Sequence, residues 1–464
     1  MYYCLFLIPL IFLAVIVFRA VAAPSPHVRI APLVEGSLPK FSLPQAEESA
    51  VQLCEGNDAE LSSADDTLYA LLPSQEEKQT LLCCAARYAP DAFESFIEVS
   101  YPLLSTAAKT RVVGRSLYLE LPVETDLLPV VCAVQMDVPD ASITAQSRNP
   151  FFFAGGQFDG PPRAIAMLDA LENVLRQGGK LKRGLTFVFL HDQNDTQVVL
   201  QDLQQNGQAY ACVLCEGGHI AQFGRNKKNR IAAVGIGTRT QAMFHMHSIS
   251  DDCANTKSSN CALHMLAQAV LYLEDPSFSP RLDSASRQFA KSALYENGFF
   301  SRMLAMNPRV FAPIVLKILG KYGGENCARN QAVVTNLLAS RTGALDIESG
   351  ADIDCILAPH ESVIRFEKKL RKRINDDRIA LELVHADEAH IYADVTSFGY
   401  KAVQKAVALS FPNTNAAPVV MIDAPLAKAL RPLCACTLAF SPYGEDFGGN
   451  TQCTFFENFF LQLC

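Results

Sequence analysis

The sequence predicts an α/β protein with a central, mostly parallel sheet, helices on both faces of that sheet, and an inserted α+β domain. Between residues 130 and 214, short apolar runs alternate with helical patterns. This is the order of elements in a parallel sheet that is buried on both faces. After residue 228, strands with alternating faces and amphipathic helices indicate a smaller α+β sandwich. The buried-strand pattern returns at about residue 395, so the sandwich interrupts the main domain.

The first part of the main domain is expected to contain three buried strands separated by two helices. The first helix begins with prolines and ends with Gly178-Gly179, which are start and stop signals for a helix. In chain order, the elements are the strand 130–138, the helix 161–179, the strand 185–190, a helix near 197–206 and the strand 209–214.

Acidic or amide side chains fall at or just beyond the end of each of these strands. Asp137 ends the first strand, residues 191–194 follow the second, and Glu216 follows the third. Because sites in parallel sheets form at the carboxyl ends of the strands, these residues are the candidate site. The second strand runs into two amides, Gln193 and Asn194, at a place where a pair of acids would make a working site.

The domain boundaries follow from these changes of pattern. A short apolar segment and a Pro-, Ser- and Ala-rich stretch precede the main domain. The predicted parts are a signal peptide or anchor at 1–23, a linker at 24–59, the α/β domain at 60–228 and 395–464, and the inserted α+β lid or dimerisation domain at 229–394.

Composition limits the classes of function. The chain has 464 residues, 49% hydrophobic and 19% charged, which indicates a folded protein of two or three domains. Its net charge is −8, and it has no long Lys/Arg run. Neither nucleic acid nor an anionic membrane surface is therefore an obvious partner.

The N-terminal segment points to the secretory pathway. Residues 4–18 contain no charge, and the small residues 20–23 follow them. This order is typical of a cleaved signal peptide, and an uncleaved anchor or a buried helix are the alternatives. We therefore expect a secreted or vacuolar/lumenal protein, or one anchored to the membrane by this segment.

Fifteen cysteines fit the same route, and some of them should pair there. Their connectivity cannot be read from the sequence. Cys212 and Cys215 have a zinc-like spacing, but they lie in an apolar strand pattern without a second pair at a matching distance. Buried thiols or disulfide partners are the preferred interpretation.

The order and spacing of several landmarks resemble the dizinc metallopeptidase family of aminoacylases and carboxypeptidases. The most similar branch contains carboxypeptidase S and the secreted N-acyl-amino-acid hydrolases. The resemblance covers most of the chain from about residue 80 onward. It implies a phosphorylase/hydrolase-like zinc peptidase domain interrupted by a smaller lid that often dimerises. The landmarks are "VQMDVP", "GGQFDGPPRAIAMLDALE", "FLHDQND", "CVLCEGGHI", "NCALHMLAQAVLYLE" and "LAFSPYGEDFGG".

The resemblance assigns five metal-ligand positions, and two of them are kept. Asp159 stands where an Asp bridges the two zinc ions, and Glu216 stands at another carboxylate ligand. The other three positions hold Gln135 in place of the first His, Asn194 in place of a carboxylate, and at about Gly448 no His.

The positions of the other chemical groups are also substituted. Gln193 stands at the general base, and Cys253 stands at the lid His that would stabilise an oxyanion. Asp137, which would orient the first His from the second shell, is kept. Asp423 matches a substrate-binding motif, but the Ser and Arg that should follow it are absent.

These substitutions predict a metallopeptidase or amidohydrolase homologue that is catalytically inactive and has a binding or regulatory role. An amide cannot accept a proton near neutral pH, and it binds zinc poorly. No cofactor is therefore expected. The alternative is an active carboxypeptidase or N-acyl-amino-acid hydrolase with a remodelled zinc site, which would act on C–N amide bonds. A structural or interaction protein without the cleft is a third hypothesis.

Several other residues are candidate metal ligands or modification sites, and each also has an ordinary structural interpretation. His219 is the best replacement ligand, and His191 could supply one metal contact. Asn194-Asp195-Thr196 is an N-glycosylation sequon, which could carry a glycan if the chain is secreted; a chance match that is occluded after folding is the preferred interpretation. A solvated surface or a loop is the preferred interpretation for His245 and His247, for His385 and His390, and for the basic run Lys368 to Arg373. Expected partners are a second chain, as a homodimer or heterodimer through the lid, and a peptide or N-acyl amino acid.

Overall fold

The computed structural model describes residues 15–20, 90–136, 146–148, 151–153, 160–191, 193–222, 230–250, 262–274, 278–295, 298–321, 328–341, 347–387, 392–442 and 449–464. The chain divides into two compact units. The first consists of residues 1–26 and 208–446, and the second of residues 27–207 and 447–464. No helix in the described ranges is long and apolar enough to cross a bilayer.

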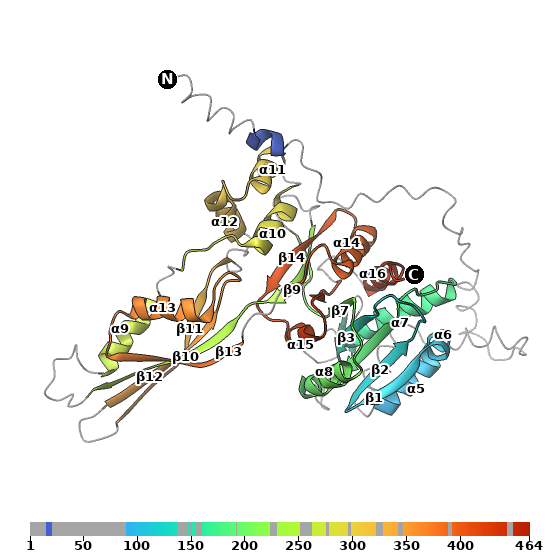
Figure 1. The fold of residues 1–464 in the computed structure, drawn as a ribbon, viewed down its shortest axis with the longest axis horizontal. Helices are drawn as coiled ribbons and strands as arrows, with labels where there is room; N and C mark the ends of the chain where they lie inside the picture. The colour runs from blue at the N-terminus through green and yellow to red at the C-terminus, as the bar shows by residue number, and fades with distance from the viewer. Residues whose placement is uncertain are drawn as a thin grey trace, which may run out of the picture. The chain divides into compact units, whose positions relative to one another are not determined.

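The second unit is an α/β layer built on the strand order β1-β2-β6-β3 (Figure 1). β3 and β6 are parallel, and β1 and β2 extend the sheet with antiparallel pairs. Its elements are α5 (Pro90–Ser100), α6 (Pro102–Ala107), β1 (Lys109–Val113), β2 (Ser116–Leu121), β3 (Val130–Gln135), β4 (Gln146–Arg148), β5 (Phe151–Phe153), α7 (Gly160–Arg176), β6 (Leu185–Leu190), the 3₁₀ turn η1 (Gln193–Asp195), α8 (Thr196–Gln205) and α16 (Gly449–Phe460).

Buried aromatic residues hold this unit together. Every residue of β3 is buried, as the apolar run in the sequence predicts. α7 packs on β3, and the C-terminal helix α16 packs along α7. Phe460 meets the ring of Phe187 on β6 edge to face, with 5.7 Å between the ring centroids. The end of the chain therefore completes a core that begins some 270 residues earlier in the sequence.

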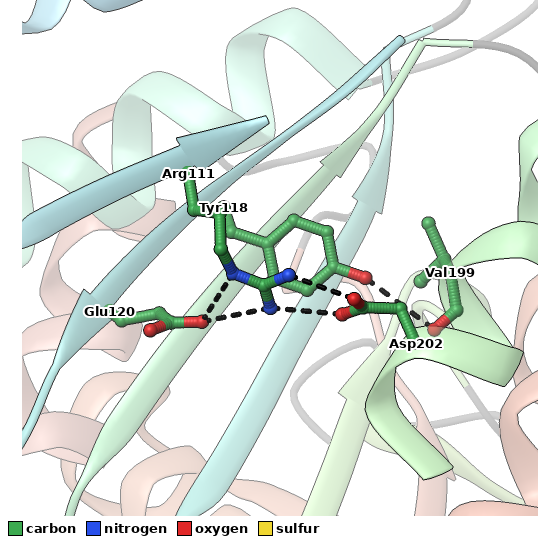
Figure 2. A network of polar contacts seen from close by, with 5 residues as sticks. All are labelled: Arg111, Tyr118, Glu120, Val199 and Asp202. Carbon is green, nitrogen blue, oxygen red and sulfur yellow. Dashed lines mark hydrogen bonds and ion pairs between the residues drawn. The ribbon is translucent and has the colours of Figure 1, made fainter. Parts of the chain in front are cut away.

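Arg111 fastens α8 to the edge of the sheet (Figure 2). Its guanidinium donates two hydrogen bonds to Asp202 on α8, at 2.8 and 2.9 Å, and another to Glu120 at 3.1 Å. It also lies over the ring of Tyr118, 4.6 Å from the centroid. The hydrogen bond to Asp202 is the main reason that the pKa of Arg111 is raised. This paired arrangement fixes the helix that begins directly after η1.

The first unit contains two sheets. One has the strand order β7-β15-β9-β14, in which β7–β15 and β9–β14 are parallel and β8 pairs with β9. The other has the order β11-β12-β10-β13 and is antiparallel throughout. The strands are β7 (Cys212–Cys215), β8 (Ile220–Gln222), β9 (Arg230–Thr238), β10 (Gln241–Ser250), β11 (Gln331–Arg341), β12 (Ile347–Ile356), β13 (Ile379–Asp387), β14 (Thr414–Met421) and β15 (Thr437–Ala439).

The helices of this unit fall into groups by the sheet on which they pack. α9 and α13 cover the antiparallel sheet through a shared core that includes Phe244, Ile353 and Phe366. α10 packs on β14, and α14 and α15 accompany the parallel strands (Figure 1). The helices are α9 (Ala262–Glu274), α10 (Ser284–Leu294), α11 (Phe299–Met306), α12 (Ala312–Lys321), α13 (Val363–Ile374), α14 (Phe398–Ser410), α15 (Pro425–Leu430) and the 3₁₀ turn η4 (Arg431–Leu433).

The predicted fold class is confirmed: parallel strands with accompanying helices, and a separate antiparallel sheet with helices. The predicted domain boundaries stay predictions. Within the range expected for the lid, β9 pairs with β14 in the parallel sheet, and α10 packs on that same sheet. An apolar pattern shows that a face is buried but not which surface buries it, which explains both placements.

A buried arginine joins the two sheets of the first unit. Arg239 follows β9 and is 1% exposed. Its backbone N–H donates to Met421 O at 2.8 Å, at the end of β14. Its side chain donates to the carbonyls of Leu357 and Ile356 at the end of β12, at 2.8 and 3.0 Å. The two sheets therefore meet through hydrogen bonds that satisfy this buried cation.

Candidate functional site

In the second unit, β3 and β6 end side by side, as the sequence predicts. They are parallel with Gln135 opposite Leu190, and Met136 N–H donates to Leu190 O at 2.7 Å. The Gln135 side chain is 3% exposed. η1 begins three residues after the end of β6 with Gln193 and Asn194. The structure therefore places a buried amide residue beside the turn that carries the other two amides.

α7 begins against the same strand end. Gly160 is its first residue, and a Cβ added there would lie 2.0 Å from the carbonyl oxygen of Gln135. Only glycine allows such an approach of two backbones. The helix therefore starts directly beside the position expected for the first metal ligand. Asp159, the residue before it, lies outside the described residues, as do Asp137, Cys253 and Gly448.

His191 is already engaged by a cation. Its Nε2 lies 2.6 Å from Nη2 of Arg115. Because a guanidinium only donates, the ring nitrogen accepts this hydrogen bond with its lone pair. A metal would have to displace Arg115 to use that nitrogen. Nε2 of His191 is therefore occupied by Arg115.

In the first unit, Glu216 directly follows β7 and is half-buried. Phe440 N–H donates to Cys215 O at 3.0 Å, and Gly217 N–H donates to Ser441 Oγ at 3.1 Å. These bonds hold the turn that carries Glu216 against the end of β15. His219, the best replacement ligand from the sequence, is an exposed residue three positions later.

The described residues do not fit a zinc pair. Zinc sites in proteins use imidazole, thiolate and carboxylate ligands. The positions at the ends of β3 and β6 supply the amide of Gln135 and the amide of the exposed Asn194. No group of three His, Cys, Asp or Glu side chains that could hold a metal occurs in the described part of the chain. Of the expected carboxylate ligands, Glu216 is the one that this part of the chain contains.

The remaining histidines and basic residues occupy ordinary surface positions. His245 Nδ1 lies 2.7 Å from Asp352 across β10 and β12, and its ring stacks on His247. His385 lies 3.1 Å from Asp387, and His390 lies outside the described residues. The basic run from Lys368 to Arg373 lies on α13, whose apolar residues face the core.

One thiol has an environment that the sequence analysis did not single out. Cys436 Sγ lies 3.1 Å from Ser397 Oγ, and Ser397 caps α14. A hydrogen bond with Cys212, the contact with Ser397 and the backbone N–H groups of Tyr400 and Gly399 lower the pKa of Cys436 to about 6. The spacing Cys434-Ala-Cys436 ahead of a strand was the available clue.

Comparisons with known proteins show which sequences and folds this chain resembles. No protein-family model matches the chain. The probable carboxypeptidase S-like 2 of Dictyostelium discoideum is 24% identical over 362 residues, covering 72% of this chain and 69% of that protein. The N-fatty-acyl-amino acid synthase/hydrolase PM20D1 of Mus musculus is 22% identical over 348 residues, covering 70% and 69%.

Among solved structures, the M20 family metallo-carboxypeptidase Sso-CP2 from Sulfolobus solfataricus has the same fold. Its TM-score is 0.51 at 15% identity, over 87% of this chain and 99% of that one. The fold is therefore that of this M20 family structure, with a second, antiparallel sheet. In sequence, the chain is similar to carboxypeptidase S-like and PM20D1 proteins, which confirms the resemblance.

Proposed function

We propose that this chain is a catalytically silent homologue of the M20 peptidases, which binds a peptide-like or N-acyl amino acid ligand without hydrolysing it. The observation that carries the proposal is Gln135, a 3% exposed amide residue at the carboxyl end of β3, beside the turn that begins with Gln193 and Asn194. The names of the relatives suggest the ligand classes.

The physical argument concerns the metal and the base together. A neutral amide oxygen is a weak zinc ligand, and its nitrogen lone pair is delocalised. An amide at position 193 cannot take a proton from water near neutral pH. Loss of general base catalysis alone lowers a rate by about 10²–10⁴. Loss of the metal also removes the means of activating water.

The test is made on the secreted protein or, where it is not secreted, on the full chain. Zinc content is measured after dialysis against zinc, and hydrolysis is assayed on N-acyl amino acids and dipeptides, with Sso-CP2 as the active control. We expect no stoichiometric zinc pair and no turnover, while calorimetry detects binding of one of these ligand classes. Two zinc ions per chain together with turnover would establish the alternative, an active hydrolase with a remodelled site that uses Asp159 and Glu216.

The same protein sample tests two further proposals, passage through the secretory pathway and dimerisation through the lid. Asn194 is exposed in the structure, as a glycosylation site in the secretory pathway requires. β11 is the terminal strand of the lid sheet and exposes Val333, Leu337 and Leu338, which supports pairing through the lid. Peptide mapping that finds Asn194 wholly unmodified would exclude the glycan. Light scattering that finds a monomer would exclude the homodimer.

A further inference from the structure

A helical hairpin, α11 and α12 with the turn between them (residues 299–321), stands on the first unit as a feature separate from the candidate site. α10 joins it to the parallel sheet through a core shared with Ile231 and Ala417. Figure 1 shows α10 beside β14, with α11 and α12 beyond α10. The apolar residues of α11 and α12 that belong to this core are therefore buried.

The hairpin exposes four large apolar side chains. Phe299 and Phe300 are 54% and 63% exposed, and Val310 and Ile314 are 46% and 45% exposed. Single exposed apolar residues are ordinary on soluble proteins. Phe299 and Phe300 are adjacent at the start of α11, and exposed apolar residues that lie together mark sites of interaction.

The charge of the hairpin is opposite to that of the whole chain. Between Glu296 and Glu325 the sequence contains four basic residues and no acidic one, although the net charge of the chain is −8. The four basic residues are Arg302, Arg309, Lys317 and Lys321. Arg309, Lys317 and Lys321 are exposed. Aromatic and aliphatic residues beside Lys and Arg are the composition of helices that lie in a membrane interface.

The apolar N-terminal segment meets the chain at this same hairpin. Residues 15–20 are helical, and Ile16 and Ala20 are 5% and 0% exposed. Asn307, in the turn between α11 and α12, donates its Nδ2–H to Ile16 O at 3.3 Å. Phe18 is 70% exposed. The end of the segment with membrane-like composition and the basic, apolar hairpin are therefore neighbours.

We propose that the α11–α12 hairpin is a membrane-contacting surface, which places Phe299 and Phe300 at the acyl boundary of an anionic phospholipid bilayer and its Lys and Arg residues among the lipid phosphates. The chain has no long Lys/Arg run, so its sequence does not point to an anionic membrane surface as a partner. The basic residues and the exposed phenylalanines of the hairpin favour contact with such a membrane. The inference is independent of the proposed function, because no candidate site residue lies on the hairpin.

A bilayer fits this surface better than a second copy of the chain does. A second copy would bring Lys317 and Lys321 against the same positive charges, and like charges across an interface oppose association. An anionic bilayer supplies phosphate to the basic residues and hydrocarbon to the exposed phenylalanines.

The chain contains no Trp, so one substitution gives a site-specific reporter. In full-length Phe300→Trp, we expect a blue-shifted emission with phosphatidylcholine/phosphatidylserine vesicles, and quenching when their acyl chains are brominated. The matched control is Tyr272→Trp on α9, an exposed aromatic position (48%) on the lid, which should show neither effect. The readout depends on the position of the Trp, so an N-terminal anchor does not mimic it.

The charge contribution is tested with two matched pairs of lysines. Lys317→Glu with Lys321→Glu should weaken the response to phosphatidylserine vesicles at least about tenfold. Lys368→Glu with Lys372→Glu makes the same change, at the same spacing, on exposed residues of α13, and should have little effect. Absence of quenching in Phe300→Trp, equal losses in both pairs, or a blue shift that rises with protein concentration without vesicles would each overturn the proposal.

Discussion

At the scale of single residues, the buried cysteines differ in the pKa of their thiols. Hydrogen bonds with Cys212, with Ser397 and with backbone N–H groups at the start of α14 lower the pKa of Cys436 to about 6. Burial raises the pKa of Cys132 on β3 and of Cys355 on β12 to about 12. The three thiols are all buried, so the difference lies in what they contact rather than in their exposure.

This difference predicts selective alkylation. Because the thiolate is the reactive form, iodoacetamide should modify Cys436 at pH 7, with a midpoint near pH 6 in the pH profile. Cys132 and Cys355 are the matched buried controls and should react only after unfolding. Ser397→Ala removes one hydrogen bond to the thiolate and should move the midpoint to higher pH. Mass spectrometry of tryptic peptides measures all three thiols, and equal rates at pH 7 would contradict the prediction.

The lowered pKa of Cys436 determines how the contribution of this residue to stability changes with pH. Folding lowers the pKa of Cys436 from its ordinary value of 9.0, so the folded state favours the thiolate. The contribution of this residue to stability is therefore complete above about pH 9 and is lost as the pH falls through about 6.

At the scale of elements, sequence patterns predicted those segments whose own residues decide their structure. α13 is one of the amphipathic helices expected after residue 228, because Ser362 caps it and Val363, Phe366, Leu370 and Ile374 form one buried face. The start of α7 and the end of β6 follow from proline and apolar signals in the same way. The placement of α10 on β14 was not predicted, because a helical apolar face fits many surfaces equally well.

The turn after β7 shows how an element can depend on one glycine. Gly218 has φ +65°, and a Cβ added there would lie 2.1 Å from the carbonyl oxygen of Ala233. Gly207 has φ +62°, with nothing within 4 Å of such a Cβ. The two positions therefore share the backbone strain of a positive φ but differ in the space around them.

This pair predicts two different costs of substitution. Gly207→Ala should lower the free energy of unfolding by about 1 kcal/mol, the cost of a left-handed conformation for an L-residue. Gly218→Ala should lower it by at least about 2 kcal/mol more, because a backbone oxygen must move. Thermal and urea unfolding measure both variants. A smaller loss in Gly218→Ala than in Gly207→Ala would mean that the turn carrying Glu216 is not held against β9.

At the scale of the whole molecule, the candidate residues come from distant parts of the sequence. Gln135 and residues 193–194 belong to one unit, and Glu216 belongs to the other. Their positions at strand ends could be predicted, because the order of strands and helices defines a parallel sheet. The contact of Arg115 with His191 could not, since it depends on a side chain that arrives from the β1–β2 turn.

Because the substitutions are spread in this way, restoring one residue should not restore hydrolysis. Gln193→Glu places a carboxylate at the position of the general base. In an active enzyme, general base catalysis raises the rate by a factor of about 10²–10⁴. Under the proposed function, a base would have no activated water to deprotonate, because Gln135 and Asn194 remain amides at positions that the resemblance assigns to metal ligands. Hydrolysis of N-acyl amino acids by Gln193→Glu should therefore equal that of the unchanged chain, and its zinc content should not rise. Gln197→Glu, at an exposed position on α8, controls for the added charge. A hundredfold gain in Gln193→Glu alone would mean that a metal-activated water is already present, and that the chain is an enzyme lacking only its base.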